Sequence, residues 1–215
     1  MSQIKDAKQK ARGRPPLAEL KIDQMRHRIT EAAQRLFQDE GYDAISIRRL
    51  AKDVGCTPMS LYSYFDGKID ILRALWADVF SRLFLRVNAA TPENEGPSSV
   101  LLARCKAYVQ FWLEHRDSYR MVFMSGGIDQ TEVSVFVETS PVAGDYATFL
   151  EALALATDRP MSETVEPAQA LICGLNGISH SLITISGYPW STPDTLVTLL
   201  VNGAIVGSRI GTEAP

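Results

Sequence analysis

Apolar side chains recur at helical spacing along most of the chain, which predicts an all-α protein of about nine helices. The first such stretch runs from Gln24 to Gly41, where a turn-forming Asp-Glu-Gly sequence ends it. Two short helices joined by a tight turn are expected between Ser46 and Phe65. A long amphipathic stretch then runs from Lys68 to about Asn88. We therefore expect a compact group of three helices that leads into a larger helical body.

The two short helices carry the sequence signals of a helix-turn-helix. Ser46 is an N-cap residue for the first helix, and Gly55 ends it, because a left-handed residue is cheap only without a Cβ atom. Thr57 then supplies a cap and Pro58 a preset first position, so the second helix is expected over about Pro58–Tyr64. Its outward face is short, polar and aromatic, which suits the major groove of DNA.

The rest of the chain is also expected to be helical, with one exception. Helices are predicted over about 97–115, 117–124, 141–157, 163–186 and 192–207. Residues 128–140 are polar and β-branched, and we interpret them as a mobile connection, with local extended structure over 133–137 as an alternative.

The last two predicted helices are almost free of charge. Asp, Glu, Lys and Arg are absent from residues 168–187 and from residues 195–207. Helices that are apolar nearly all round need burial on more than one side. We therefore predict a homodimer whose interface is a four-helix arrangement of these two helices and their symmetry mates. Close approach would be allowed by the small residues Ala170, Gly174, Gly177, Gly203 and Gly207.

The spacing of residues over roughly 22–75 resembles the tetracycline-repressor (TetR) family of bacterial regulators. The matching residues are Ala33, Leu36, Phe37, Gly41, Tyr42, Ser46, Ile47, Leu50, Ala51, Gly55, Leu61, Tyr62, Tyr64, Phe65, Lys68 and Leu72. Residues 115–123 also resemble a segment of the TetR subgroup with a WHG-type C-terminal ligand domain.

This resemblance implies an organisation and a function. A DNA-binding helix-turn-helix domain would span residues 22–67, and a helical ligand-binding and dimerisation domain residues 68–215. The protein would be a dimeric repressor that binds a palindromic double-stranded DNA operator and is released by an unknown small apolar ligand. The alternatives are an activator of the same family and an architectural or ligand-independent DNA-binding dimer.

The resemblance also implies which residues contact DNA. It places Thr57, Tyr62, Tyr64 and Lys68 at the DNA backbone, beside the opening amides of the helix that Pro58 begins. Base edges are then left to Met59, Ser60 and Ser63, with Ser46 and Arg48 as further candidates. The second helix contains no arginine that could read guanine, so specificity would depend on Arg48, the N-terminal arm or DNA shape. Partial packing with solvated hydroxyl groups is the alternative for the two tyrosines.

The first 21 residues form a separate, basic segment. They contain few large apolar side chains, so we expect a flexible arm without a core of its own. The sequence Arg12-Gly13-Arg14-Pro15-Pro16 within it resembles an AT-hook, whose arginines lie in a narrow minor groove. Insertion of Arg12 and Arg14 into the groove, attraction to phosphates by charge alone, and a tail with no role in DNA binding all remain open.

The charge distribution agrees with this division. Residues 1–86 contain 16 Lys and Arg against 11 Asp and Glu, whereas residues 87–215 contain 6 against 14. The N-terminal part is therefore positive although the whole chain has a net charge of −3. A basic end can attract DNA phosphates while an acidic body stays off the duplex.

Large aromatic side chains are the candidates for ligand binding. Six of them are expected near the centre of the body: Trp76, Phe80, Tyr108, Phe111, Trp112 and Phe123. Such residues alone more often form a solid core, but the family resemblance favours a cavity. Asn176 and His180 lie one turn apart on an otherwise apolar helix, where they would bind a ligand's polar end or each other, a water or the dimer mate.

The remaining chemistry-bearing residues give no sign of catalysis. His27, His115 and His180 lack metal-ligand spacing, and no nucleophile motif or phosphate loop is present, so we expect no enzyme, cofactor or metal. The three cysteines are expected to be free thiols. No signal peptide and no apolar run of membrane-spanning length is found, which predicts a cytoplasmic protein without a membrane partner.

Overall fold

The computed structural model describes residues 17–92, 95–125 and 130–210. All regular secondary structure in these ranges is helical, which confirms the predicted all-α class. The arginines of the predicted arm, Arg12 and Arg14, lie outside the described residues.

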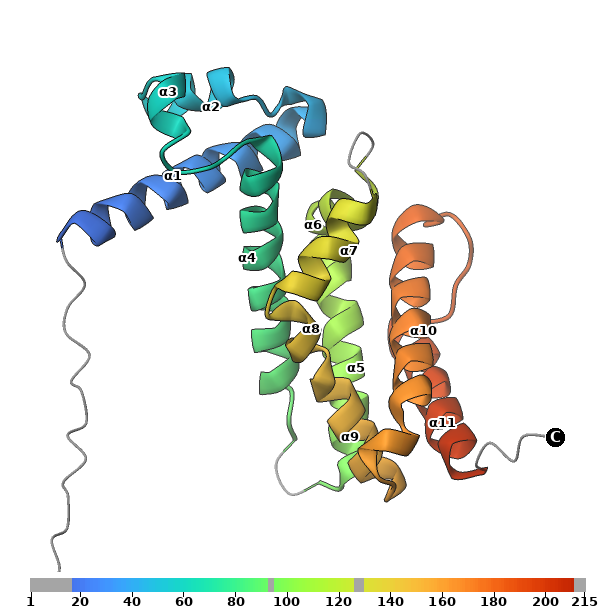
Figure 1. Cartoon of the computed structure of the whole chain (residues 1–215). Coiled ribbons are helices and arrows are strands. Elements are labelled where there is room, and N and C mark those ends of the chain that lie inside the picture. The colour runs from blue at the N-terminus through green and yellow to red at the C-terminus, as the bar shows by residue number, and fades with distance from the viewer. Residues whose placement is uncertain (1–16, 93–94, 126–129, 211–215) are drawn as a thin grey trace, which may run out of the picture.

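The head of the molecule consists of α1 (Leu17–Glu40), the short 3₁₀ helix η1 (Tyr42–Ala44), α2 (Ile47–Val54) and α3 (Pro58–Leu61). In Figure 1 these elements lie together beyond one end of a larger body. Helix α1 begins earlier than expected, so residues 17–21 are helical and not part of an extended arm.

The second helix of the helix-turn-helix is shorter than predicted. It ends at Leu61 instead of Tyr64, and the chain continues in turns. The Ser63 N–H donates to the Ser60 carbonyl (3.1 Å) and the Tyr64 N–H to the Leu61 carbonyl (2.9 Å). These are bonds between residues three apart, which tighten the last turn of a helix into 3₁₀ geometry. Residues 62–64 therefore continue α3 as a 3₁₀-like turn and not as α-helix.

The body contains the remaining helices, with a 3₁₀ turn (η2, Met161–Glu163) between two of them. These helices are α4 (Lys68–Ala89), α5 (Pro97–Glu114), α6 (Arg116–Phe123), α7 (Gln130–Thr139), α8 (Val142–Asp145), α9 (Ala147–Thr157), α10 (Val165–Thr184) and α11 (Pro193–Ile210). Helix α5 is central, because it packs against α4, α9, α10 and α11. Helix α4 runs from the head down the length of the body, as Figure 1 shows.

The expectation for residues 128–140 is wrong over its described part, because residues 130–139 form helix α7. The alternation of Val133, Val135 and Val137 is typical of a strand. The pattern of buried side chains is instead that of a helix. Phe136 is 5% exposed and packs in the core, with Val133 and Val137 partly buried beside it. These three residues lie at helical spacing on one face, while Val135 is 43% exposed. The helix predicted over 141–157 is divided at Tyr146 into α8 and α9.

One continuous hydrophobic cluster extends from the head into the body. Helix α4 contributes nine buried residues to it, from Ile71 near the head to Val87 at the far end. A change in the tilt of α4 would therefore alter the packing of both the head and the body.

Candidate functional site

The turn between α2 and α3 is built by local capping interactions. The Ser46 hydroxyl accepts a hydrogen bond from the Arg49 N–H (3.3 Å), and the Thr57 hydroxyl accepts one from the Ser60 N–H (3.1 Å). Gly55 ends α2 with φ at 73°, a left-handed conformation that favours glycine. The sequence prediction of these caps is confirmed.

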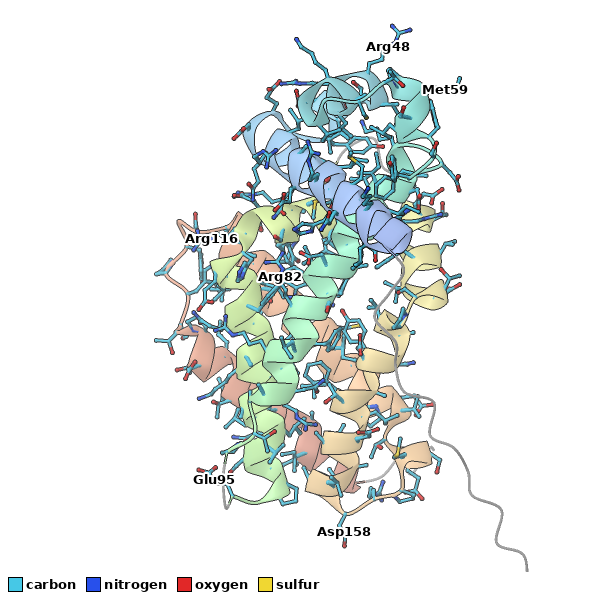
Figure 2. The ribbon with its side chains drawn as sticks, turned by 90° about the vertical axis from the view of Figure 1, so that its left-hand side faces the viewer. Arg48, Met59, Arg82, Glu95, Arg116 and Asp158 are labelled. Carbon is cyan, nitrogen blue, oxygen red and sulfur yellow. The ribbon has the colours of Figure 1, made fainter. Side chains whose placement is uncertain are left out.

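The predicted DNA-contact residues of the head lie mostly on its outer surface. Met59 is 79% exposed and Tyr62 is 51% exposed. Also exposed are Ser46, Arg48, Thr57, Pro58, Ser60 and Ser63. Figure 2 shows Arg48 and Met59 projecting from the end of the head that is farthest from the body. Tyr64 differs, because it is partly buried and packs against the core.

Two arginines of α1 have structural partners that the sequence did not reveal. Arg26 donates to the Tyr64 carbonyl and lies over the Phe65 ring, with its guanidinium carbon 4.1 Å from the ring centroid. Arg28 donates to the Val54 carbonyl (2.8 Å) at the end of α2. Both interactions join α1 to the helix-turn-helix and cap carbonyl groups at helix or turn ends. These cations therefore hold the DNA-binding unit together.

Arg49 of α2 is also engaged within the head. Its guanidinium makes a two-pronged ion pair with Glu40 at the end of α1, with one N–O distance of 2.7 Å. The hydrogen bond from Arg49 lowers the pKa of Glu40 below its ordinary value. The preceding residue, Arg48, turns outward, so these neighbouring arginines differ in their surroundings.

The ammonium group of Lys68, a predicted contact of the DNA backbone, has a partner within the head. It donates to the Tyr42 carbonyl (2.7 Å) and sits 3.5 Å from the centroid of the Tyr42 ring. Burial lowers the pKa of Lys68 and raises the pKa of Tyr42. Lys68 thus fixes the start of α4 against the head through a hydrogen bond and a cation–π contact.

The aromatic residues predicted to bind a ligand form one cluster inside the body. Trp76, Phe80, Tyr108, Phe111 and Trp112 are each at most 2% exposed. The ring centroids of Phe80 and Trp112 are 6.1 Å apart, and those of Trp112 and Phe123 are 5.4 Å apart, both edge to face. These are ordinary distances for packed aromatic pairs.

A polar edge adjoins this aromatic cluster. The Tyr108 hydroxyl donates to Asn176 Oδ1 (2.7 Å) and lies 3.2 Å from the hydroxyl of Tyr146, which the sequence did not single out. The Tyr119 hydroxyl lies 3.3 Å from His180 Nδ1. Asn176 and His180 therefore have protein partners, although His180 is exposed on the single chain.

The tyrosines of this edge are held in their neutral form. Burial raises the pKa of Tyr119 and of Tyr146 to about 12, and the pKa of Tyr108 well above its ordinary value. Each can therefore donate a hydrogen bond at any physiological pH.

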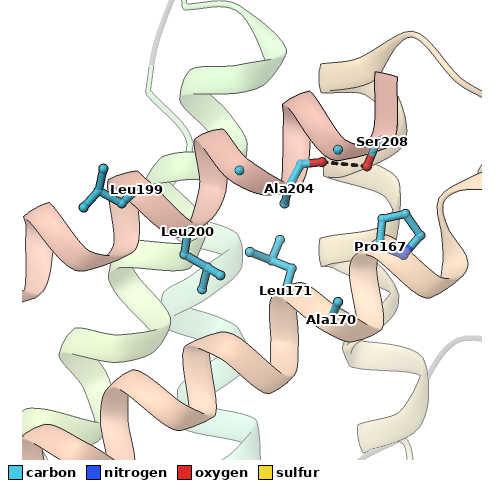
Figure 3. Close-up of a pocket in the computed structure, with 9 residues that line it drawn as sticks. Pro167, Ala170, Leu171, Leu199, Leu200, Ala204 and Ser208 are labelled. Carbon is cyan, nitrogen blue, oxygen red and sulfur yellow. Dashed lines mark hydrogen bonds between the residues drawn. The ribbon is translucent and has the colours of Figure 1, made fainter. Parts of the chain in front are cut away.

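Residues 168–184 of α10 and 195–207 of α11 carry no charged side chain, and a groove of about 450 Å³ lies between the two helices, as Figure 3 shows. Leu199 is 66% exposed beside it and Val206 is 55% exposed. A Cβ atom on Gly174 would lie 2.7 Å from Leu200, so Gly174 permits close packing of α10 on α11 within one chain. The space beside Gly177, Gly203 and Gly207 is open, by contrast.

Two other structural features are absent from the described residues. These residues contain no helix that is long and apolar enough to cross a bilayer. They also contain no group of three or more His, Cys, Asp or Glu side chains arranged to hold a metal ion.

Comparisons with known proteins agree with the geometry of the head. Residues 29–75 match the family described as bacterial regulatory proteins of the tetR family. The chain is 25% identical over 104 residues to the uncharacterized HTH-type transcriptional regulator YuxN of Bacillus subtilis, covering 48% of this chain and 36% of YuxN. It is 25% identical over 127 residues to the HTH-type transcriptional activator FasR of Mycolicibacterium smegmatis, covering 59% of this chain and 58% of FasR. Each match thus spans less than two thirds of the relative's length.

The whole fold also has solved counterparts. A TetR-like transcriptional regulator from Rhodococcus sp. RHA1 superposes with a TM-score of 0.60 over 90% of this chain and 98% of its own, at 19% sequence identity. The similarity in fold thus extends through the body, beyond the residues that match the family in sequence. Taken together, the helix-turn-helix and its family match assign residues 29–75 to the tetR family of bacterial regulatory proteins, and the helical body shares the fold of a solved TetR-like regulator.

Proposed function

We propose that this protein is a homodimeric, ligand-responsive regulator that binds a palindromic DNA operator. The observation that carries the proposal is the exposed outer face of α2 and α3, which presents Arg48, Met59 and Tyr62. This face lies within residues 1–86, whose net charge is positive. Such a face fits the major groove, and the positive charge favours the phosphates.

The proposed contacts are assigned mainly to side chains that are exposed on α2, on α3 and in the turns after α3. Arg48 is the candidate for reading a base, since Arg26, Arg28 and Arg49 have protein partners. Met59, Ser60 and Ser63 lie beside it for further base contacts, while Thr57 and Tyr62 are proposed to contact phosphates. Tyr64 and Lys68 would contribute by fixing the ends of the unit, and the opening amides after Pro58 would face the backbone.

The dimer is proposed to form through α10 and α11. Their charge-free stretches, residues 168–184 and 195–207, carry exposed Leu199 and Val206 and have open space at Gly177 and Gly203. A second copy of the same surface would bury these groups around a two-fold axis, as in isologous interfaces.

The sense of regulation is proposed to be repression, with release by a small apolar molecule bound in the aromatic cluster. The buried rings and the tyrosine–asparagine edge support a site for such a molecule. Activation is the second candidate, because the relative FasR is described as an activator. A promoter fusion in cells with and without the gene separates the two, since deletion raises expression under repression and lowers it under activation.

The experiment that tests DNA binding is footprinting on the DNA that flanks the gene. We expect one protected near-palindromic site, with affinity that falls steeply as salt rises because bound counterions are released. Absence of any protected site at low salt, in the flanking DNA and in a genome-wide selection, would refute the proposal.

A further inference from the structure

Two residues one turn apart on α4 carry buried donors without acceptors. The Arg73 Nε and the Trp76 indole Nε1 are buried, and neither has a hydrogen-bond partner among the described residues. Positions 73 and 76 are one turn apart, so both side chains leave α4 on the same side. A buried N–H without an acceptor costs free energy, and such groups are rare in native proteins. Their pairing indicates a place suited to a hydrogen-bond acceptor.

Helix α7 covers this place with an apolar side chain. The Phe136 ring lies edge-on to Trp76, with centroids 5.5 Å apart, and is 6.1 Å from Phe80. Figure 1 shows α7 in the part of the body nearest the head. These apolar surroundings favour an acceptor that is carried by an apolar molecule.

The positive charge of Arg73, at the edge of the α4–α7 contact, is already paired with a carboxylate. An Arg73 terminal nitrogen lies 2.6 Å from Glu132 Oε2 of α7, and the two side chains are 38% and 36% exposed. An anion would lie beside the Glu132 carboxylate, and a cation would meet donors instead of acceptors. Both charged forms are therefore disfavoured relative to a neutral molecule.

We propose that the α4–α7 contact opens to bind an uncharged apolar molecule whose carbonyl or ether oxygen accepts hydrogen bonds from Trp76 and Arg73. This inference deepens the proposed ligand response and rests on it. It names the chemical class of the ligand and the donors that recognise it.

The position of this contact connects it to the head. Glu132 lies near enough to Tyr42 for its charge to raise the pKa of Tyr42, after the larger effects of burial and of Asp43. Tyr42 in turn holds Lys68 at the first turn of α4. A molecule that lifts α7 would strain the Arg73–Glu132 ion pair beside this junction, so binding would bias the position of α4 under the head.

The test uses four probes with the same chain length: 2-octanone, octanoate, octylammonium and octane. The Trp190→Phe variant serves as background, because fluorescence then reports only Trp76 and Trp112. We expect 2-octanone to change this fluorescence saturably and to raise Tm, with an affinity about tenfold higher than that of the other three probes, as one hydrogen bond would give.

The Trp76→Phe variant, made in the same background, removes the N–H but keeps an aromatic ring. It should lower the affinity for 2-octanone about tenfold and leave the affinity for octane unchanged, read from Tm shifts and Trp112 fluorescence. Equal losses for both probes would show a packing effect and overturn the proposal. So would octanoate binding as tightly as the ketone, or no binding of any probe, which would mean that the donors serve only a buried water. Operator footprinting is a separate readout, so a failure of DNA binding remains distinguishable from a failure here.

Discussion

At the scale of single residues, the head separates its cations into structural and exposed groups. Arg26, Arg28 and Arg49 are held by carbonyl or carboxylate oxygens of the protein, whereas Arg48 and Lys52 are exposed on α2. Only a cation that is free of internal partners can offer all its donors to DNA. This separation allows different consequences to be predicted for neighbouring substitutions.

Arg48→Ala should weaken operator binding in a base-dependent way. A bidentate contact to guanine contributes about 1–3 kcal/mol, so we expect a loss of roughly 5- to 150-fold at the operator and relaxed preference at one base pair of each half-site. Competition binding against a set of single-base operator variants measures this. Lys52→Ala is the matched control, expected to weaken all sequences alike and to reduce the salt slope by about 1. The same pattern for both variants would contradict a base-reading role for Arg48.

Lys68→Met should affect the fold of the head more than its charge contacts with DNA. It removes the bond to the Tyr42 carbonyl and the contact with the Tyr42 ring. We expect a loss of about 1–2 kcal/mol in the free energy of unfolding, measured by urea denaturation. Lys68→Arg, which retains a charge over the ring, should lose less. If Lys68→Met instead leaves stability unchanged and lowers the salt slope of operator binding, the ammonium contacts phosphate in the complex.

At the scale of elements, the structure was predicted well where local signals determine it. It was not predicted where contacts between distant residues determine it. The caps Ser46, Gly55 and Thr57 act within a few residues, so the bounds of α2 and the start of α3 followed from sequence. Helix α7 was missed because burial of Phe136 against Trp76, 60 positions earlier, overrides its β-branched composition.

The candidate site shows the same division between local and distant information. Exposure of Met59 and Tyr62 followed from helical periodicity, but the partners of Arg26, Arg28 and Lys68 are 26 to 38 positions away. The sequence shows that these residues are cations and not which acceptors they meet. Tyr146 was overlooked for the same reason, because only the fold brings it to Tyr108.

Deletion of residues 1–16 tests the predicted arm without touching α1, which begins at Leu17. We expect the fold and the oligomeric state to be unchanged and operator affinity to fall, because the segment carries Lys5, Lys8, Lys10, Arg12 and Arg14. Arg12→Ala combined with Arg14→Ala then distinguishes the alternatives. A larger loss on A·T-flanked than on G·C-flanked operators, measured by fluorescence anisotropy, indicates minor-groove insertion. Equal losses indicate attraction by charge, and no loss excludes a role of these arginines in DNA binding.

At the scale of the whole molecule, the proposed function requires two heads at a fixed separation. A palindromic operator places its half-sites about 34 Å apart, one turn of DNA, so each head binds tightly only when the other is engaged. The α10–α11 surface would set this separation through dimerisation, and α4 would transmit changes within each body to its head. Dimerisation and operator affinity should therefore be lost together.

Leu199→Glu tests this dependence with a close internal control. Leu199 is 66% exposed on α11, and Leu85 is 74% exposed on α4, away from the proposed interface. A carboxylate at position 199 would be buried unpaired in the dimer, which costs several kcal/mol, so we expect a monomer in sedimentation velocity at micromolar concentration. Operator affinity should then fall by about 10²-fold or more, because the second half-site no longer binds as part of the same molecule. Leu85→Glu adds the same charge and should remain dimeric with unchanged affinity. The α10–α11 interface is wrong if Leu199→Glu stays dimeric, and the coupling of dimerisation to DNA binding is wrong if a monomeric Leu199→Glu retains operator affinity.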